Sequence, residues 1–180
     1  MNVKEYGSRL PTKLTSSEIE ALKRFPQLAR EFCRFIEEAD GCDRDDLIQD
    51  LSISLAGLCQ VAAQLPNVEP ATEGADYTQE EIENHGREYA RVSALLRAKL
   101  GGLDVFWEVY DPTEESKPIQ FSLANNVAEI YLDLKDSLAP QSATIEVNDL
   151  YWQWRADFRS HWSRHAASAL KVTLFLMGSV

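Results

Sequence analysis

Apolar residues recur at steps of three and four along most of this chain, in five successive segments. The first segment, from Ser16 to Gly41, carries apolar side chains at this spacing from Ile19 to Ile36, and the second runs from Asp43 to Leu65. Side chains three and four residues apart lie on one face of an α-helix. Each segment therefore predicts a helix that buries one face against its neighbours.

Local signals mark where several of these helices begin and end. Thr78 and Glu81 have the spacing of a capping box, which opens the third helix, and Gly101–Gly102 provides its natural end. Pro26 leaves two alternatives for the first segment. It either opens a second helix at that point or kinks a single one.

The last two segments run from Ser122, the expected N-cap, to Pro140, and from Ile145 to Met177. The fifth contains no helix breaker and is predicted to be one long helix. Residues 103–111 alternate apolar with other residues, which indicates a short extended piece but no convincing strand pair. The prediction is an all-α fold, a single-domain bundle of about five antiparallel helices over residues 16–178, after a flexible N-terminal segment, residues 1–15.

The chain is acidic, with 18 basic and 29 acidic residues among 180 and a formal net charge of -11. Because this charge repels a phosphate backbone, we expect no nucleic-acid partner. The apolar run at residues 172–177 is too short to cross a bilayer, and no signal peptide is recognisable. We expect a cytoplasmic protein with no membrane partner, whose three cysteines are reduced thiols.

The charges are unevenly distributed along the chain. Acidic residues are dense from Glu37 to Asp50 and from Glu69 to Glu83, whereas no Asp or Glu follows Asp157. In the simpler interpretation, the cationic last helix docks on the anionic remainder of the bundle. In the alternative, an exposed acidic face binds a basic partner protein.

Asp157, His161 and His165 follow one another at four-residue steps, along one edge of the predicted fifth helix. Two imidazoles at this spacing can bind one divalent metal ion, with Asp157 as a third ligand or as the acceptor that orients a ring. Glu129 and Asp133 are possible further ligands from the fourth helix. The competing interpretation is that both histidines are structural, because they fall within the apolar stripe of their helix, and the Glu-x-x-His motif of dimetal bundles is missing.

Aromatic residues crowd the fifth helix, and Trp152 points away from the others. A helix with two aromatic faces is either sandwiched centrally or has one face that awaits a partner. Trp152 beside Arg155 and Arg159 combines the residue types that dominate protein-binding hot spots. Trp107 and Asp111, in the loop after the third helix, are further candidates for this binding surface.

Four short groups of residues, spread over residues 32–170, have the pattern of a known family. The first two are Phe32-Cys33 with Ile36-Glu37, and Trp107-x-Val109-x-Asp111-Pro112. The other two are Ser122-Leu123-Ala124 with Ile130-Tyr131-x-Asp133-Leu134-Lys135, and Trp154-Arg155-x-Asp157-Phe158-x-x-His161-Trp162-x-x-His165. Together they resemble a bacterial family known as a domain of unknown function, the 5063 family. The resemblance implies a helical fold and a bacterial source, and no reaction. Asn125 and Asn126 depart from the acidic pair expected there, and Ser163 departs from an expected glycine.

These observations favour a non-catalytic cytoplasmic protein-interaction module, such as an adaptor or an immunity-type inhibitor, with no cofactor. It would bind a partner protein through its acidic surface and an aromatic-arginine patch, comprising Trp107, Asp111, Trp152, Arg155 and Arg159. The alternative is a metal-binding helical bundle, such as a metal-dependent hydrolase, with a divalent metal centred on Asp157, His161 and His165. A third hypothesis is a small-molecule sensor with a site between helices near Trp107 and Trp154.

Overall fold

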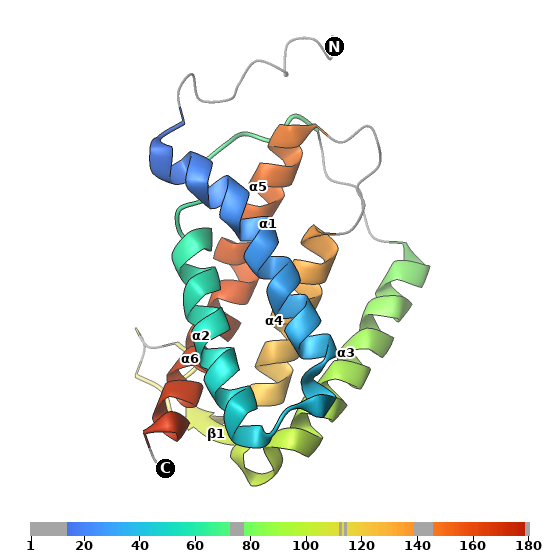
Figure 1. Cartoon of the computed structure of the whole chain (residues 1–180), viewed down its shortest axis with the longest axis vertical. Coiled ribbons are helices and arrows are strands. Elements are labelled where there is room, and N and C mark those ends of the chain that lie inside the picture. Colours follow the sequence, from blue (N-terminus) through green and yellow to red (C-terminus); the bar gives the residue numbers. More distant parts are fainter. Residues whose placement is uncertain (1–13, 73–77, 112, 114, 139–145, 179–180) are drawn as a thin grey trace.

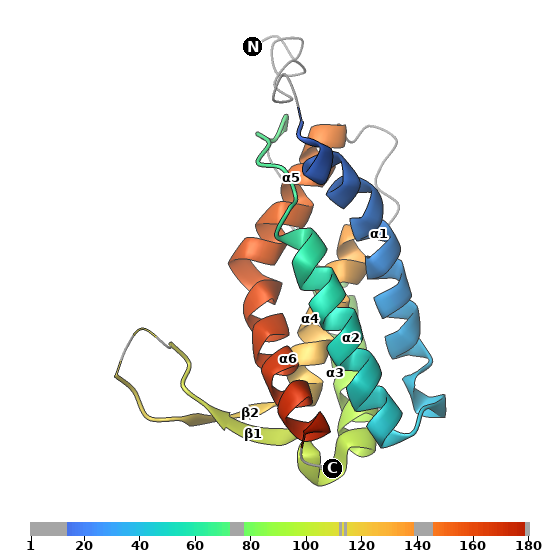
Figure 2. The same cartoon turned by 60° about the vertical axis from the view of Figure 1, so that its left-hand side comes forward.

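The helical stretches pack side by side as a bundle in which successive stretches run in opposite directions, while the last two helices continue in one direction (Figures 1 and 2). The structure, a computed structural model, describes residues 14–72, 78–111, 113, 115–138 and 146–178. The all-α, single-domain prediction is confirmed, with one small two-stranded sheet in addition. Most of the segment predicted to be flexible, residues 1–13, lies outside the described residues.

The elements follow one another in a simple order. The first helices are α1 (Ser16–Glu37) and α2 (Arg44–Ala62), joined by the 3-10 turn η2 (Ala39–Gly41), and α3 (Gln79–Leu100) ends in the 3-10 turn η3 (Gly101–Leu103). The strands β1 (Val105–Glu108) and β2 (Ile119–Ser122) lead into α4 (Leu123–Ser137). The last helical stretch comprises α5 (Val147–Asp157), the π-helical turn η4 (Phe158–Trp162) and α6 (Ser163–Met177).

α1 is a single helix with Pro26 inside it. Phe25 and Ala29, close to the proline, have no exposed surface. The free energy gained by burying them offsets the loss of the backbone hydrogen bond that proline cannot make. Thr15 and Glu18 form a capping box at the start of α1, as the Thr78 box does at the start of α3. Only the box at α3 is predicted from the sequence.

The prediction of one uninterrupted fifth helix is wrong, because a π turn separates α5 from α6. A π turn contains one residue more than an α turn, and this extra residue changes which side chains face inward. Trp154 and Trp162 are both buried, and the Phe25 ring lies 5.1 and 6.4 Å from their rings. The π turn therefore lets two tryptophans eight residues apart pack on the same phenylalanine of α1.

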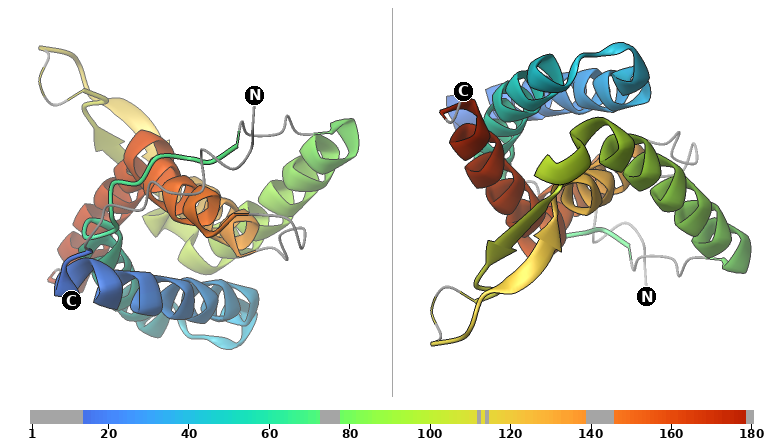
Figure 3. Two further views of the ribbon diagram at one scale, coloured as in Figure 1. Left: turned by 90° about the horizontal axis from the view of Figure 1, so that it is seen from above. Right: turned by 90° about the horizontal axis from the view of Figure 1, so that it is seen from below.

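The expectation of no strand pair is also wrong, since β1 and β2 form an antiparallel hairpin. Phe106 and Phe121 are paired across it, with ring centroids 5.8 Å apart. The buried carboxylate of Asp104 joins the hairpin to α4 by accepting hydrogen bonds from Ser122 Oγ at 2.9 Å and from the Ala124 amide at 2.7 Å. The hairpin projects away from the bundle, as the views along the bundle in Figure 3 show.

α4 lies at the centre of the bundle and packs against α1, α3 and α6. Its buried residues face all of these neighbours, which is why its apolar surface extends around more of the helix than a single stripe. They are Leu123, Ala124, Asn126, Val127, Ala128, Ile130, Tyr131, Leu132, Leu134 and Ser137. No helix in the described part of the chain has the length and apolarity needed to cross a membrane.

Candidate functional site

One group of histidines and carboxylates lies where α4 meets the last helical stretch. Asp133 on α4 contacts His161 in the π turn, with 2.7 Å between Asp133 Oδ2 and His161 Nδ1. His85 on α3 pairs with Asp136 on α4 in a similar way. Each of these rings has a carboxylate that fixes its orientation. The structure thus brings together Asp133 and His161, two of the five residues predicted as metal ligands.

The other candidate ligands have different partners. Asp157 Oδ2 accepts a hydrogen bond from Ser137 Oγ at 3.2 Å, and His165 Nδ1 lies 3.0 Å from Asn126 Oδ1. The rings of His161 and His165 meet edge to face, with centroids 5.0 Å apart. Within the described ranges, no three His, Cys, Asp or Glu side chains form a group that could hold a metal ion. The five candidates therefore do not assemble into one ligand set.

Burial shifts the pKa of four side chains in this region. It raises the pKa of Asp157 to about 6, with the neighbouring Asp133 carboxylate as the second cause. Burial also raises the pKa of Asp133 and of Glu129. By contrast, burial lowers the pKa of His165 to about 4, so its ring is neutral at pH 7.

A pocket of about 500 Å³ separates the hairpin from the first half of α6, and we call it the hairpin pocket. Its volume is in the range of small-molecule sites. On the hairpin side, Glu108 is held by Ser168 and by Lys171 Nζ, the latter at 2.9 Å. The other side chains that give the pocket its chemistry are Tyr110, Phe121, Asn126, His161, Arg164 and His165.

A second hollow, of about 380 Å³, lies between β1 and the end of α6, and we call it the hairpin groove. Two large side chains on its rim are mostly exposed, Trp107 by 67% and Phe175 by 72%. The groove is lined by Gly102, Leu103, Val105, Phe106, Trp107, Lys171, Val172, Phe175 and Leu176. It is thus an apolar surface with a single charged side chain.

The predicted aromatic-arginine patch is divided between two ends of the molecule. Trp152 on α5 is 42% exposed and Arg159 is exposed in the π turn. The guanidinium of Arg155 instead donates a hydrogen bond to the backbone carbonyl of Leu65, after α2. α5 and the hairpin that carries Trp107 lie at opposite ends of the bundle in Figure 2, so these residues do not form one surface.

Asp111 and Trp154 have structural partners. The Asp111 carboxylate accepts hydrogen bonds from the Thr113 amide at 2.8 Å and hydroxyl at 2.7 Å, as a turn residue does. Trp154 is buried and donates from Nε1 to the Ser137 carbonyl at 3.1 Å. Since Trp107 is exposed on the hairpin, these two tryptophans do not surround a common ligand site.

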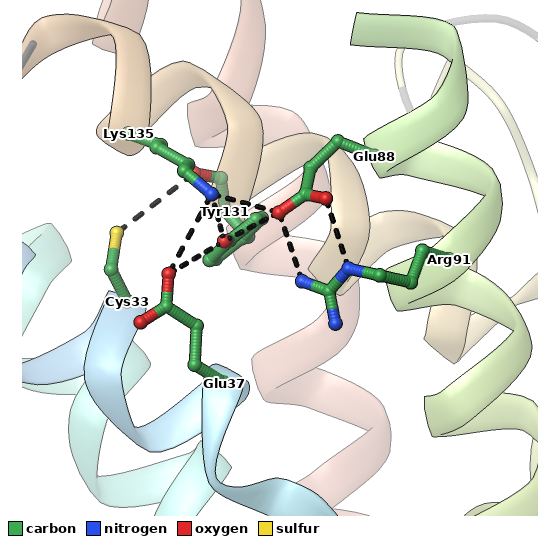
Figure 4. A network of polar contacts seen from close by, with 6 residues as sticks. All are labelled: Cys33, Glu37, Glu88, Arg91, Tyr131 and Lys135. Atoms are coloured by element: carbon green, nitrogen blue, oxygen red, sulfur yellow. Dashed lines mark hydrogen bonds and ion pairs between the residues drawn. The ribbon is translucent and has the colours of Figure 1, made fainter. Parts of the chain in front are cut away.

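A polar network joins α1, α3 and α4 around the buried Tyr131 (Figure 4). The Tyr131 hydroxyl lies 2.9 Å from carboxylate oxygens of both Glu37 and Glu88, and accepts a hydrogen bond from Lys135 Nζ at 2.6 Å. Burial raises the pKa of Tyr131 to about 12. Arg91 holds Glu88 through two contacts of 2.9 Å and is the main reason that the pKa of Glu88 is lowered. Such a saturated network stabilises helix packing.

Asn126 and Phe175 are site residues that sequence reasoning does not identify. The signal for Asn126 is an amide within the apolar stripe of its helix, between Leu123 and Ile130. Phe175 belongs to an apolar run that reads as core, yet its side chain is exposed. Whether an apolar residue at the end of α6 lies in the core or in the hairpin groove depends on where the hairpin packs, which the sequence does not show.

Comparison with known proteins identifies a family and a fold. The model of a family described as a domain of unknown function, DUF5063, matches residues 17–177. The crystal structure of protein BF1032 from Bacteroides fragilis is similar, with a TM-score of 0.69 and 22% sequence identity, and the match covers 87% of this chain and 91% of that one. This similarity shows the fold alone. No curated protein matches the chain.

Proposed function

Since this chain belongs to the DUF5063 family, whose description states no activity, we propose a function from its surface. The protein is an interaction module that binds an apolar segment of a partner protein in the hairpin groove. An adaptor and an immunity-type inhibitor would both use such a surface. The identity of the partner distinguishes between them.

The exposure of Trp107 and Phe175 on the two sides of the groove carries this proposal. Burying apolar surface contributes about 25 cal/mol per Å², and large aromatic residues dominate binding hot spots. The projecting hairpin supports one of these side chains without itself being part of the bundle core. A partner that fills the groove removes both rings from water.

The charges around the groove favour an acidic partner segment. Lys171 is 69% exposed on its rim, where the Glu108 carboxylate balances part of its charge, and α6 contains no carboxylate. The acidic residues from Glu37 to Asp46 are exposed elsewhere, around the turn between α1 and α2. An acidic segment is therefore repelled there and attracted to α6. This partner differs from the basic one expected when the acidic surface is taken as the binding site.

Site-specific photo-crosslinking tests the proposal. A photoreactive amino acid replaces Trp107 in one variant and Ile53 in a matched control, because Ile53 is also apolar and is similarly exposed, by 62%, on α2. Both variants are expressed in the native cells, and crosslinked proteins are identified by mass spectrometry. We expect a distinct partner at position 107 that is missing at position 53.

Affinity measurements with the purified partner decide the outcome. Trp107→Ala should weaken binding by about 2 kcal/mol, or roughly 30-fold in Kd, and Ile53→Ala should leave it unchanged. Raising the salt concentration should slow association, because the charges steer the encounter. Identical crosslinks at both positions, or an unchanged Kd for Trp107→Ala, would refute binding through the groove.

A further inference from the structure

The buried side chain of Asn126 has an unused pair of hydrogen-bond donors. Asn126 is 5% exposed, and its Oδ1 is paired with His165 Nδ1 at 3.0 Å. Its Nδ2 has no hydrogen-bond partner among the described residues. A buried NH₂ group without a hydrogen-bond partner costs about 1–3 kcal/mol. Asn126 lines the hairpin pocket, so an acceptor atom that reaches the enclosed Nδ2 after a small side-chain shift removes this cost.

The charged side chains around the pocket favour an anion. Arg164 and Lys171 contribute two positive charges, and Glu108 contributes one negative charge, which leaves +1 in a chain of net charge -11. Glu108 is already held by Lys171 and Ser168. Arg164 donates from one terminal nitrogen, Nη2, to the Ser160 carbonyl at 3.0 Å and carries further N–H donors.

The remaining walls of the pocket are aromatic and apolar. Tyr110 and Phe121 come from the hairpin, and Phe121 is braced by the Phe106 ring behind it at 5.8 Å. His165 is neutral at pH 7 and adds a further flat ring from α6. Flat surfaces of this kind bind a planar body by stacking, and the polar groups determine its orientation.

We propose that the hairpin pocket binds a small aromatic carboxylate. The planar body lies against Tyr110 and Phe121, and the carboxylate accepts hydrogen bonds from Asn126 Nδ2 and from the guanidinium of Arg164. This site is separate from the hairpin groove, although Lys171 borders both. Occupation of one does not require occupation of the other.

Nuclear magnetic resonance of the full ¹⁵N-labelled chain tests this directly. The side-chain NH₂ signals of Asn126 are assigned by their loss in Asn126→Asp and report on the proposed acceptor. The probe is 2-naphthoate, and 2-naphthamide is its neutral counterpart of the same shape. We expect saturable shifts of the Asn126 NH₂ signals with 2-naphthoate, and binding at least about tenfold weaker with 2-naphthamide.

Two arginine variants separate the pocket from general charge attraction. Arg164→Ala removes the cation that lines the pocket, and Arg159→Ala removes an exposed arginine from the neighbouring π turn. Arg164→Ala should weaken 2-naphthoate binding about tenfold, and Arg159→Ala should change it less than about twofold. Three results each overturn the proposal: no saturable shift at Asn126, equal binding of the two compounds, or unchanged binding by Arg164→Ala.

Discussion

A single buried carboxylate holds the segment after α2 against α5. Asp149 is 9% exposed and accepts hydrogen bonds from the Ala71 and Thr72 amides and from the Thr72 hydroxyl, the last at 2.8 Å. No local sequence pattern connects residues 77 or more positions apart. The segment is irregular, so these contacts provide backbone partners that a helix would supply internally.

Asp149→Ala should reduce the free energy of unfolding by about 2 kcal/mol, because three hydrogen-bond donors lose a buried carboxylate acceptor. Urea unfolding followed by circular dichroism measures this loss. Asp149→Asn keeps an acceptor oxygen at the same position and should lose less. Equal losses for the two variants would show that the carboxylate does not support the segment through hydrogen bonds.

The buried carboxylate of Asp157 should make stability depend on pH. Its pKa is about 6 in the folded protein, above the value of about 4 in an unfolded chain, so the folded state binds this proton more tightly. Its contribution to stability is therefore present at low pH and is lost as pH rises from about 4 to about 6. The lowered pKa of His165 acts in the opposite direction over a similar range.

Comparing Asp157→Asn with the unmodified protein at each pH cancels the effect of His165. Near pH 7.5 we expect the variant to be more stable by about 1–2 kcal/mol, because the neutral amide avoids the cost of a buried charge and can still accept from Ser137. Near pH 4 the difference should disappear. A variant that is less stable at the higher pH would contradict the raised pKa as the dominant effect.

The π turn is the element that distinguishes the last helical stretch from a regular helix. It contains one residue more than an α turn, and α5 and α6 each keep their own register against the bundle. Trp162, inside the turn, has no exposed surface. The amphipathic pattern along residues 145–177 predicts one helix, because so many positions there are apolar that one extra residue does not visibly interrupt the helical spacing.

Deleting Ser160, an exposed residue of this turn, should convert it into an α turn and leave α5 and α6 in register. Deleting Ala167, exposed in α6, is the matched control. It would rotate the rest of α6 by about 100° and remove Ala169 and Thr173 from the core. We expect the Ser160 deletion to lower Tm by only a few degrees and the Ala167 deletion to prevent cooperative unfolding, as measured by thermal circular dichroism. Equal effects would contradict a register role for the turn.

Across the whole molecule, Tyr131 connects three helices that are distant in the sequence. Its hydroxyl joins Glu37 of α1, Glu88 of α3 and Lys135 of α4 (Figure 4). The backbone carbonyl of Tyr131 also lies 3.9 Å from the sulfur of Cys33, and burial raises the pKa of that thiol to about 12. Cys33 is therefore a protonated core residue at neutral pH.

Tyr131→Phe should cost about 1–2 kcal/mol of unfolding free energy, since the hydroxyl is removed while its charged partners stay. A double-mutant cycle with Glu37→Gln should show a coupling of about 0.5–1 kcal/mol, because the two groups share one network. Tyr110→Phe, on the exposed end of the hairpin, is the control and should be neutral. Additive effects of Tyr131→Phe and Glu37→Gln would mean that the network does not act as a unit.

The sequence alone determined the number of helical stretches and most of their ends. Helical periodicity and capping depend on residues within four positions of one another, as in the Thr78 box of α3. Residue type and spacing singled out Trp107, His161 and Asp133 in the sequence, but only the structure shows that Trp107 is exposed and that His161 contacts Asp133.

The hairpin, the π turn, the Tyr131 network and the position of Asn126 were decided by the tertiary structure. Each depends on contacts between segments separated by a loop or by whole helices, and many arrangements satisfy the same local pattern. Which apolar side chains lie next to one another on the surface also depends on the tertiary structure. Trp107 lies beside Phe175 and away from Trp152 because the chain packs α6 against the hairpin, which no spacing along the sequence specifies.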